Sequence, residues 1–241
     1  MDIFATLELT TLDAAAFAWF LTCTLGYNLL TRGGALRHRS LLGAIQVQRL
    51  KWFSHMGRRD DRFMDVALVG NLASGNTFFA STSVILLGVL SALLGSGERA
   101  QAVIDRLPFT VHSPPALWDL KILLMMVVFV YAFFKFAWAF RLAHYAMIMV
   151  GATPPTGTAT DAECAAHAER TARLAGIAAE HGNLGLRAYY FAMAAIGWFF
   201  SPVIFLAATT FVVLIITRRE YFSRSLAAIA GPRAGDRASG K

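Results

Sequence analysis

Charged side chains are scarce in this sequence of 241 residues, because Asp, Glu, Lys and Arg together make up only 15% of it. Soluble globular domains carry about 25% of these residues, which argues against an ordinary soluble fold. The stretches 14–31, 66–97 and 188–217 contain no charged residue, and 122–140 contains only Lys135. Since about 20 residues of helix cross a bilayer, we predict an all-α transmembrane bundle of about four spans. The predicted spans lie near 12–31, 66–96, 117–149 and 186–217.

Cysteines and catalytic motifs are also few. The two cysteines, Cys23 and Cys164, fall in a predicted span and in a predicted loop, which argues against a disulfide framework. None of the six histidines has a His or Cys partner three or four residues away within a span, so we expect no metal or haem centre. The sequence has no phosphate-binding glycine loop, no Gly-x-Ser-x-Gly elbow and no His-Glu-x-x-His pair. We therefore expect no cofactor, no catalytic residue and no enzymatic activity.

The charges that are present lie close to the ends of the predicted spans. The segment 32–65 holds eight basic and three acidic residues, which indicates a cytoplasmic loop by the positive-inside rule. The net charge of +7 therefore points to lipid head groups as partners and not to nucleic acid. Because the predicted spans are helical, the expected location is a bacterial inner membrane, since outer-membrane proteins are barrels.

The chain end conflicts with a four-span arrangement. Four spans place both termini outside, yet six basic residues follow Thr217, and basic residues are typical of the cytoplasmic side. An odd number of crossings would remove the conflict, but 188–217 extends only about 45 Å as one helix and cannot cross a core of about 30 Å twice. We therefore predict one transmembrane domain over 1–226 with four spans, followed by a basic, disordered tail at 227–241.

An internal similarity links the two halves of the chain. The motif Gly-Asn-Leu at 70–72, with aromatic residues at 78–79, recurs at 182–184 and 190–191 with a constant offset of 112 residues. A duplicated helix pair would give two parallel repeats related by an axis along the membrane normal. Chance similarity within an apolar sequence is the alternative.

Several short motifs resemble those of one known family. They are FFAST at 78–82, VYAFFKF at 130–136, GLRAYYF at 185–191 and RRE at 218–220. In this order they are similar to the domain of unknown function 599 family, uncharacterised membrane proteins of bacteria and plants. The resemblance extends over 13–226 and implies a membrane protein, but it implies no activity.

Lys135 is the most conspicuous polar residue, because a charge within a span costs about 2.5–3.5 kcal/mol on insertion scales. It is a candidate for contact with a substrate or an ion. Alternatively, its amine extends toward the cytoplasmic surface, since Arg141 follows six residues later. Asp65, at the start of the second span, is a candidate counter-ion, either in a structural ion pair or in a proton relay.

Four further polar residues are candidate site residues. Asn71, Asn183 and Arg187 lie at the predicted starts of the second and fourth spans, where helix N-termini attract anions and would form a shared polar mouth. Ordinary helix capping by the two asparagines is the alternative. Asn76 belongs to a line of small polar residues in the second span, which indicates close helix packing or a polar conduit.

The first loop has the composition of a helix that lies on a membrane surface. Trp52 and Phe53 would anchor it, and Arg49 and Lys51 would contact anionic lipids. An ordinary basic loop is the alternative. We expect a non-enzymatic accessory or scaffold protein, with membrane lipids and a membrane-protein partner or a second copy as partners. The alternative is a small oligomeric carrier or channel with a polar path around Lys135.

Overall fold

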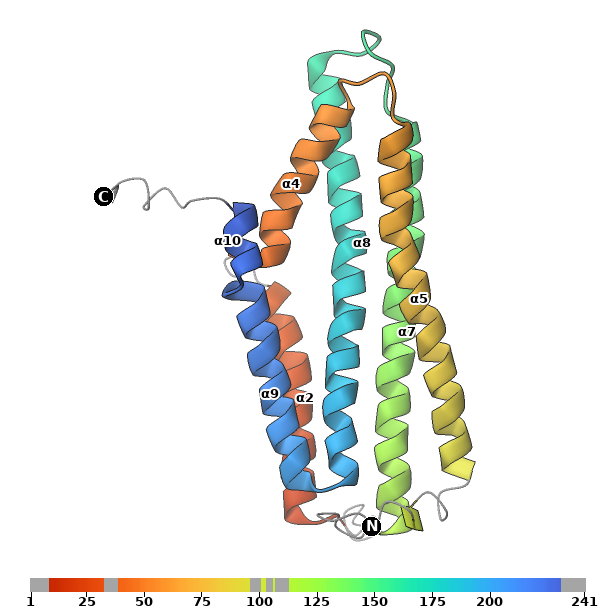
Figure 1. The fold of residues 1–241 in the computed structure, drawn as a ribbon, viewed down its shortest axis with the longest axis vertical. Coiled ribbons are helices and arrows are strands. Elements are labelled where there is room, and N and C mark those ends of the chain that lie inside the picture. The colour runs from red at the N-terminus through yellow and green to blue at the C-terminus, as the bar shows by residue number, and fades with distance from the viewer. Residues whose placement is uncertain (1–8, 33–38, 96–100, 103–105, 107–112, 231–241) are drawn as a thin grey trace, which may run out of the picture. The chain divides into compact units, whose positions relative to one another are not determined.

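The computed structural model describes residues 9–32, 39–95, 101–102, 106 and 113–230 (Figure 1). Throughout these residues the regular secondary structure is helical, which confirms the all-α prediction. The elements are α2 (Thr11–Arg32), α4 (Leu41–Met56), α5 (Phe63–Gly95), α7 (Pro115–Gly151), α8 (Asp161–Ile196), the short 3-10 helix η1 (Gly197–Phe199), α9 (Pro202–Tyr221) and α10 (Arg224–Ala230).

In the described residues, four helical stretches are long and apolar enough to cross a membrane, as the composition predicted. They are Thr11–Thr31, Phe63–Gly95, Pro115–Gly151 and Pro202–Ala230. The first three overlap the predicted spans 12–31, 66–96 and 117–149. With 33 and 37 residues, α5 and α7 extend about 50 and about 55 Å, which exceeds a hydrocarbon core of about 30 Å.

The predicted fourth span, 186–217, is wrong as a single helix, because the chain reverses direction within it. α8 ends at Ile196, and α9 begins at Pro202. Proline lacks the N–H that a helix interior needs but is well suited to the first helical position. The Ser201 hydroxyl accepts a hydrogen bond from the Ile204 N–H at 3.1 Å and so caps the new helix. At Gly197 a Cβ would lie 3.3 Å from the Ile204 carbonyl, so the tight turn favours glycine.

The helix α8 begins with a capping box at Thr160 and Glu163. Thr160 caps it, because the Glu163 N–H donates to the Thr160 hydroxyl at 3.3 Å and the Thr160 N–H donates to the Glu163 carboxylate at 2.8 Å. These bonds from the Thr160 backbone and side chain hold the pKa of Glu163 below its usual value. Gly182 does not break α8, because a helix tolerates one glycine at a cost of about 1 kcal/mol.

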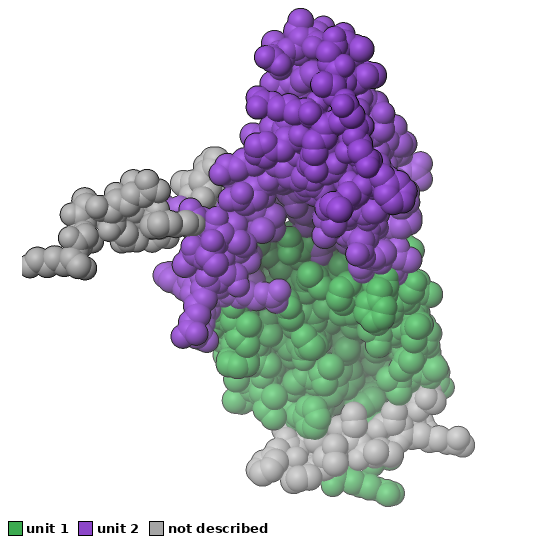
Figure 2. Space-filling view, turned by 45° about the horizontal axis from the view of Figure 1, so that its top comes forward, with its two compact units in different colours: residues 1–29, 78–136, 183–215 green, residues 30–77, 137–182, 216–241 purple. Residues whose placement is uncertain are grey.

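The chain forms two compact units, coloured separately in Figure 2. Unit 1 comprises residues 1–29, 78–136 and 183–215, and unit 2 comprises 30–77, 137–182 and 216–241. α5, α7 and α8 each contribute one part to unit 1 and another to unit 2. The residues of the predicted single domain are therefore divided between two units.

In unit 1, α2 and α8 run in opposite directions. Near the start of α2, the Asp13 carboxylate accepts a hydrogen bond from the Trp198 indole N–H at 2.8 Å, just beyond the end of α8. Further along α2, Tyr27 lies against Arg187, which is earlier in α8. α9 runs parallel to α2, since Phe20 packs on Phe205 and the Trp19 indole N–H donates to the Thr210 hydroxyl at 3.0 Å.

α7 also runs opposite to α8 within unit 1. The Trp118 ring, at the start of α7, packs on Phe199, whereas Phe129 and Phe136 pack on Tyr189. The α5 segment of unit 1 begins beside the end of the α7 segment, because the Phe79 ring stacks on Phe136. Of the five long helical segments in the described part of unit 1, α2, α7 and α9 therefore run one way and α5 and α8 the other.

Unit 2 has a small apolar core of its own. The α4 residues Phe53 and Met56 are fully buried and pack with apolar residues of α5, α7 and α8. The last helix, α10, packs on α4, and the Gln48 amide donates a hydrogen bond to the Ile229 carbonyl at 3.3 Å (Figure 1). The predicted disorder of the tail at 227–241 is therefore wrong for 227–230, which belong to α10, while 231–241 lie outside the described residues.

We predict that Gly185→Ala lowers the thermal stability of the protein in mild detergent. A Cβ at this position would lie 2.7 Å from the buried Phe136 ring, and overpacking of this kind costs about 1–3 kcal/mol. Gly88→Ala in α5 is the matched control. It meets no atom within 4 Å, and alanine favours a helix by about 1 kcal/mol over glycine. A Gly185→Ala protein as stable as the wild type would contradict the tight packing of α7 and α8.

Candidate functional site

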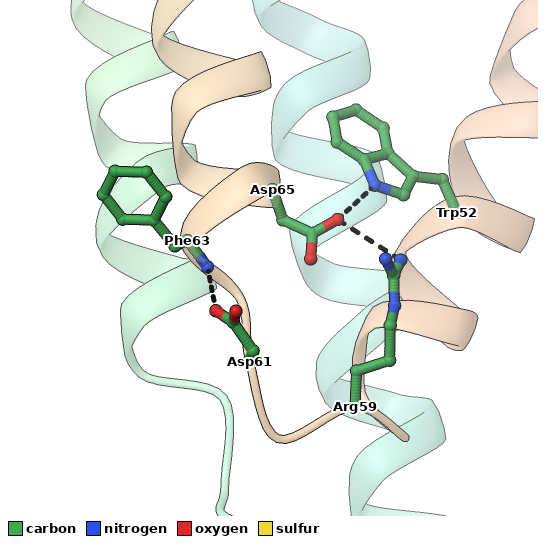
Figure 3. Close-up of polar contacts among 5 residues, drawn as sticks. All are labelled: Trp52, Arg59, Asp61, Phe63 and Asp65. Atoms are coloured by element: carbon green, nitrogen blue, oxygen red, sulfur yellow. Dashed lines mark hydrogen bonds and ion pairs between the residues drawn. The ribbon is translucent and has the colours of Figure 1, made fainter.

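A buried charged site in unit 2 surrounds Asp65 in the first turn of α5 (Figure 3). Asp65 is 1% exposed, and its Oδ1 accepts hydrogen bonds from the Trp52 indole N–H at 2.7 Å and from the Arg59 guanidinium at 3.3 Å. The ion-pair partner of Asp65 is therefore Arg59, whereas the sequence pointed to Lys135, a residue of unit 1. The contacts join α4, the following loop and α5.

The loop between α4 and α5 is held at two further points. The Phe63 N–H donates to the Asp61 carboxylate at 2.9 Å, which caps the start of α5 (Figure 3). The Arg62 guanidinium donates to the carbonyl oxygens of Thr153 and Pro154, both at 2.7 Å. The basic residues of this loop thus include structural ligands as well as solvent-facing charges.

The predicted membrane anchors of α4 are wrong, because Phe53 is fully buried in unit 2 and Trp52 bonds to Asp65. The helix turns these rings inward, since Phe53 packs in the apolar core. Arg49 is also drawn toward the protein. Its guanidinium donates to the Gln46 side chain at 2.6 Å, and burial lowers the pKa of Arg49 below its ordinary value. Of the four predicted lipid contacts, Lys51 is the exposed one.

The exposed face of α4 is different from the predicted one. Val47 and Leu50 lie on it together with Lys51, at the spacing of one helix face. Helical periodicity, applied to the whole of 41–56, places these three residues on one face. Without tertiary information, the large aromatic rings of Trp52 and Phe53 indicated the opposite face as the membrane-facing one.

Asn71 and Asn183 do not lie at helix starts, so both the shared mouth at helix starts and the capping alternative are wrong. α5 begins at Phe63, eight residues before Asn71, and α8 begins at Asp161, 22 residues before Asn183. The two residues also belong to different units. No proline near Asn71 or Asn183 ends the helix before it, so α5 and α8 continue through these positions.

Asn76 lies where α5 meets α8 within unit 2. A Cβ added at Gly182 would lie 2.8 Å from the Asn76 Oδ1, so the asparagine side chain occupies the space that the missing Cβ leaves. Asn76 is thus a packing residue in this unit.

Two of the predicted site residues, Arg187 and Lys135, lie against aromatic rings in unit 1. Arg187 is buried, with its guanidinium carbon 4.9 Å from the centre of the Tyr27 ring. Lys135 is half-buried, with its Nζ 5.2 Å from the centre of the Tyr131 ring, on the same helix. An aromatic face stabilises a cation more strongly when water is excluded, so these contacts suit charges within a bundle.

A polar cluster that sequence reasoning missed surrounds Trp198 in unit 1. Asp13 and Lys121 are both almost fully buried, at 4% and 3% exposure. Asp13 accepts from the Trp198 N–H, while the Lys121 Nζ lies 5.7 Å from the centre of the Trp198 ring and donates to the Ser113 hydroxyl at 2.7 Å. The signal was a charge close to the start of each of two apolar helices, Asp13 in the first turn of α2 and Lys121 in the second turn of α7.

A second polar contact that the sequence did not indicate joins α5 to α8. The Tyr189 hydroxyl donates to the Phe79 carbonyl at 2.9 Å and lies 2.9 Å from the Ser83 hydroxyl. Within the described ranges, no three His, Cys, Asp or Glu residues lie close enough to hold a metal ion.

We predict that Trp52→Phe lowers the free energy of unfolding by about 1–3 kcal/mol, measured by chemical denaturation in detergent. The substitution keeps a ring but removes the N–H that bonds to the buried Asp65 carboxylate. Trp138→Phe is the matched control, because Trp138 is an exposed residue of unit 2. The effect of Trp52→Phe should shrink in an Asp65→Ala background. Equal effects of Trp52→Phe and Trp138→Phe would refute a specific bond.

Comparison with known proteins places the chain in its sequence context. The model of a family described as "Protein of unknown function, DUF599" matches residues 15–225. No curated protein and no solved structure matches the chain.

Proposed function

This chain belongs to the DUF599 family of proteins of unknown function, and we propose that it is a non-enzymatic scaffold or accessory protein of a bacterial inner membrane. The proposal is carried by the aromatic packing inside unit 1. Three rings, those of Phe79, Phe129 and Phe136, surround Tyr189. A scaffold needs such a packed interior, whereas a carrier needs a polar path.

The second aromatic group of unit 1 supports the same proposal. Phe20 packs on both Phe191 and Phe205, and the Trp198 ring stacks on Phe205 and Phe17. Together with the group around Tyr189, these rings connect α2, α5, α7, α8 and α9 of unit 1. Aromatic side chains bury large areas, so this packing favours a rigid body.

The outer surface of unit 1 favours a lipid environment. Large apolar side chains are exposed on its helices, including Leu25, Phe78, Ile85, Val127, Phe134, Phe211 and Leu214. Exposed apolar surface of this extent is unusual on a soluble monomer. It is ordinary for a bundle in a bilayer, where the solvent is itself apolar.

We further propose that unit 1 crosses the membrane five times, with α8 as the additional crossing. The segment 183–196 contains one charge, Arg187, and its exposed residues are Met193 and Ile196. Its other side chains face protein, so they need not be apolar enough to face lipid. A hydropathy criterion detects lipid-facing helices and therefore passes over a helix of this kind.

Five crossings remove the conflict between the two basic segments. α2 enters unit 1 at one end, and α9, which runs parallel to it, leaves at the other end. The residues that follow α9 are then on the same side of the membrane as those that follow α2. The basic segment 32–65 and the basic residues after Thr217 would both be cytoplasmic, as the positive-inside rule requires.

The five-crossing topology predicts a cytoplasmic C-terminus. A green fluorescent protein fused after Lys241 should fluoresce, because it folds in the cytoplasm, and alkaline phosphatase fused at the same place should be inactive. Each reporter controls for the expression of the other. Active phosphatase without fluorescence would restore four crossings and contradict the proposal for α8.

The scaffold proposal predicts that protein extracted in mild detergent is recovered with a further polypeptide, either a different one or a second copy, in native mass spectrometry. Lys135→Met should leave this assembly and its abundance unchanged. A monomer with a bound small molecule that Lys135→Met releases would refute the scaffold proposal and favour the carrier.

A further inference from the structure

We infer that the corner between α9 and α10 in unit 2 binds the phosphate head group of an anionic phospholipid. Arg218 and Phe222 belong to the last turn of α9 and the residue after it, and Arg224 begins α10. All three side chains are exposed, and the Phe222 ring is 78% exposed. We call these three residues the α9–α10 corner.

No carboxylate of the described residues neutralises the charge of the corner. In the part of the chain that the structure describes, neither Arg218 nor Arg224 has a carboxylate partner within ion-pair distance. Two exposed guanidinium groups on a short stretch of chain favour a ligand with negative charge and several acceptor oxygens. A phosphodiester has both properties, and arginine can bind it through two parallel hydrogen bonds.

The position of the corner along the chain indicates a lipid source for this phosphate. The uncharged stretch of α9 ends at Thr217, so Arg218 is the first charge after the apolar part of the helix. Basic residues next to a membrane span lie at the level of the head groups. This step rests on the proposed membrane orientation.

Phe222 adds an apolar contact that a free phosphate would not use. An aromatic or aliphatic side chain between basic residues is typical of surfaces that insert between acyl chains while the cations hold head groups. The corner is also firmly supported. Ser223 caps α10, because its hydroxyl accepts from the Leu226 N–H at 3.1 Å, and Leu226 itself is buried.

The neighbouring helix extends this surface. α10 packs on α4, whose exposed face carries Val47, Leu50 and Lys51. The mixture of apolar and basic side chains is the same as at the corner. The sequence predicted a lipid contact at Trp52 and Phe53. We infer this contact instead for the exposed residues of unit 2, at the α9–α10 corner and on the exposed face of α4.

The test uses the full chain in detergent with an equimolar mixture of phosphatidylglycerol and phosphatidylcholine, and native mass spectrometry measures the lipids retained. The wild type should retain phosphatidylglycerol preferentially. Arg218→Gln combined with Arg224→Gln should weaken this retention about thirtyfold, since each juxtamembrane cation contributes about fivefold. Phe222→Ser should weaken it without any change of charge.

Arg170→Gln combined with Arg173→Gln is the matched control, because these residues are exposed on the α8 part of unit 2 and carry the same charge. Unchanged retention in the corner variant, or an equal loss in the control variant, would overturn the inference. Equal displacement by inorganic phosphate in the wild type and in Phe222→Ser would show a phosphate site without lipid specificity and would overturn it too. The number of crossings does not affect this assay, so its failure is distinguishable from failure of the proposed topology.

Discussion

The enclosure of α8 by other helices is the constraint on which unit 1 depends. Its segment carries Arg187, Asn183 and Tyr189, and polar groups of this kind are costly where no water is present to solvate them. Arg187 lies over Tyr27, and the Tyr189 hydroxyl bonds to the Phe79 carbonyl. The surrounding helices therefore supply the partners that water would supply elsewhere, and their rings fill the remaining space.

This enclosure connects the packing with the proposed role. Gly185 allows Phe136 to approach α8, and the Trp198 cluster joins the starts of α2 and α7 to the turn after α8. A bundle tied through its centre presents stable surfaces to lipid and to partners. Ring stacking fills much of its interior, and the buried polar groups there bond to protein partners, whereas a carrier would need exchangeable polar contacts. The scaffold proposal follows from this difference.

Unit 2 uses its basic residues in two ways. Arg59 bonds to the Asp65 carboxylate, and Arg62 bonds to the carbonyls of Thr153 and Pro154. Both guanidinium groups are therefore held by contacts within the fold. Arg218 and Arg224 are exposed, and within the described residues they have no carboxylate partner, so they can bind a ligand. Counting basic residues along the sequence does not separate these groups. Only the contacts of each guanidinium show which arginines are free to meet a membrane surface.

Composition alone determined the helical class and the first three apolar spans, because the absence of charge over 20 residues is a local property of the chain. The start of α8 depends likewise on local contacts, those between Thr160 and Glu163, since capping involves neighbours in sequence. Tertiary structure decided the end of α8, the turn at Pro202, the burial of Phe53 and the partner of Asp65. Each of these depends on residues distant in sequence. A side chain is buried by protein, and no longer faces lipid or water, only where another helix packs against it.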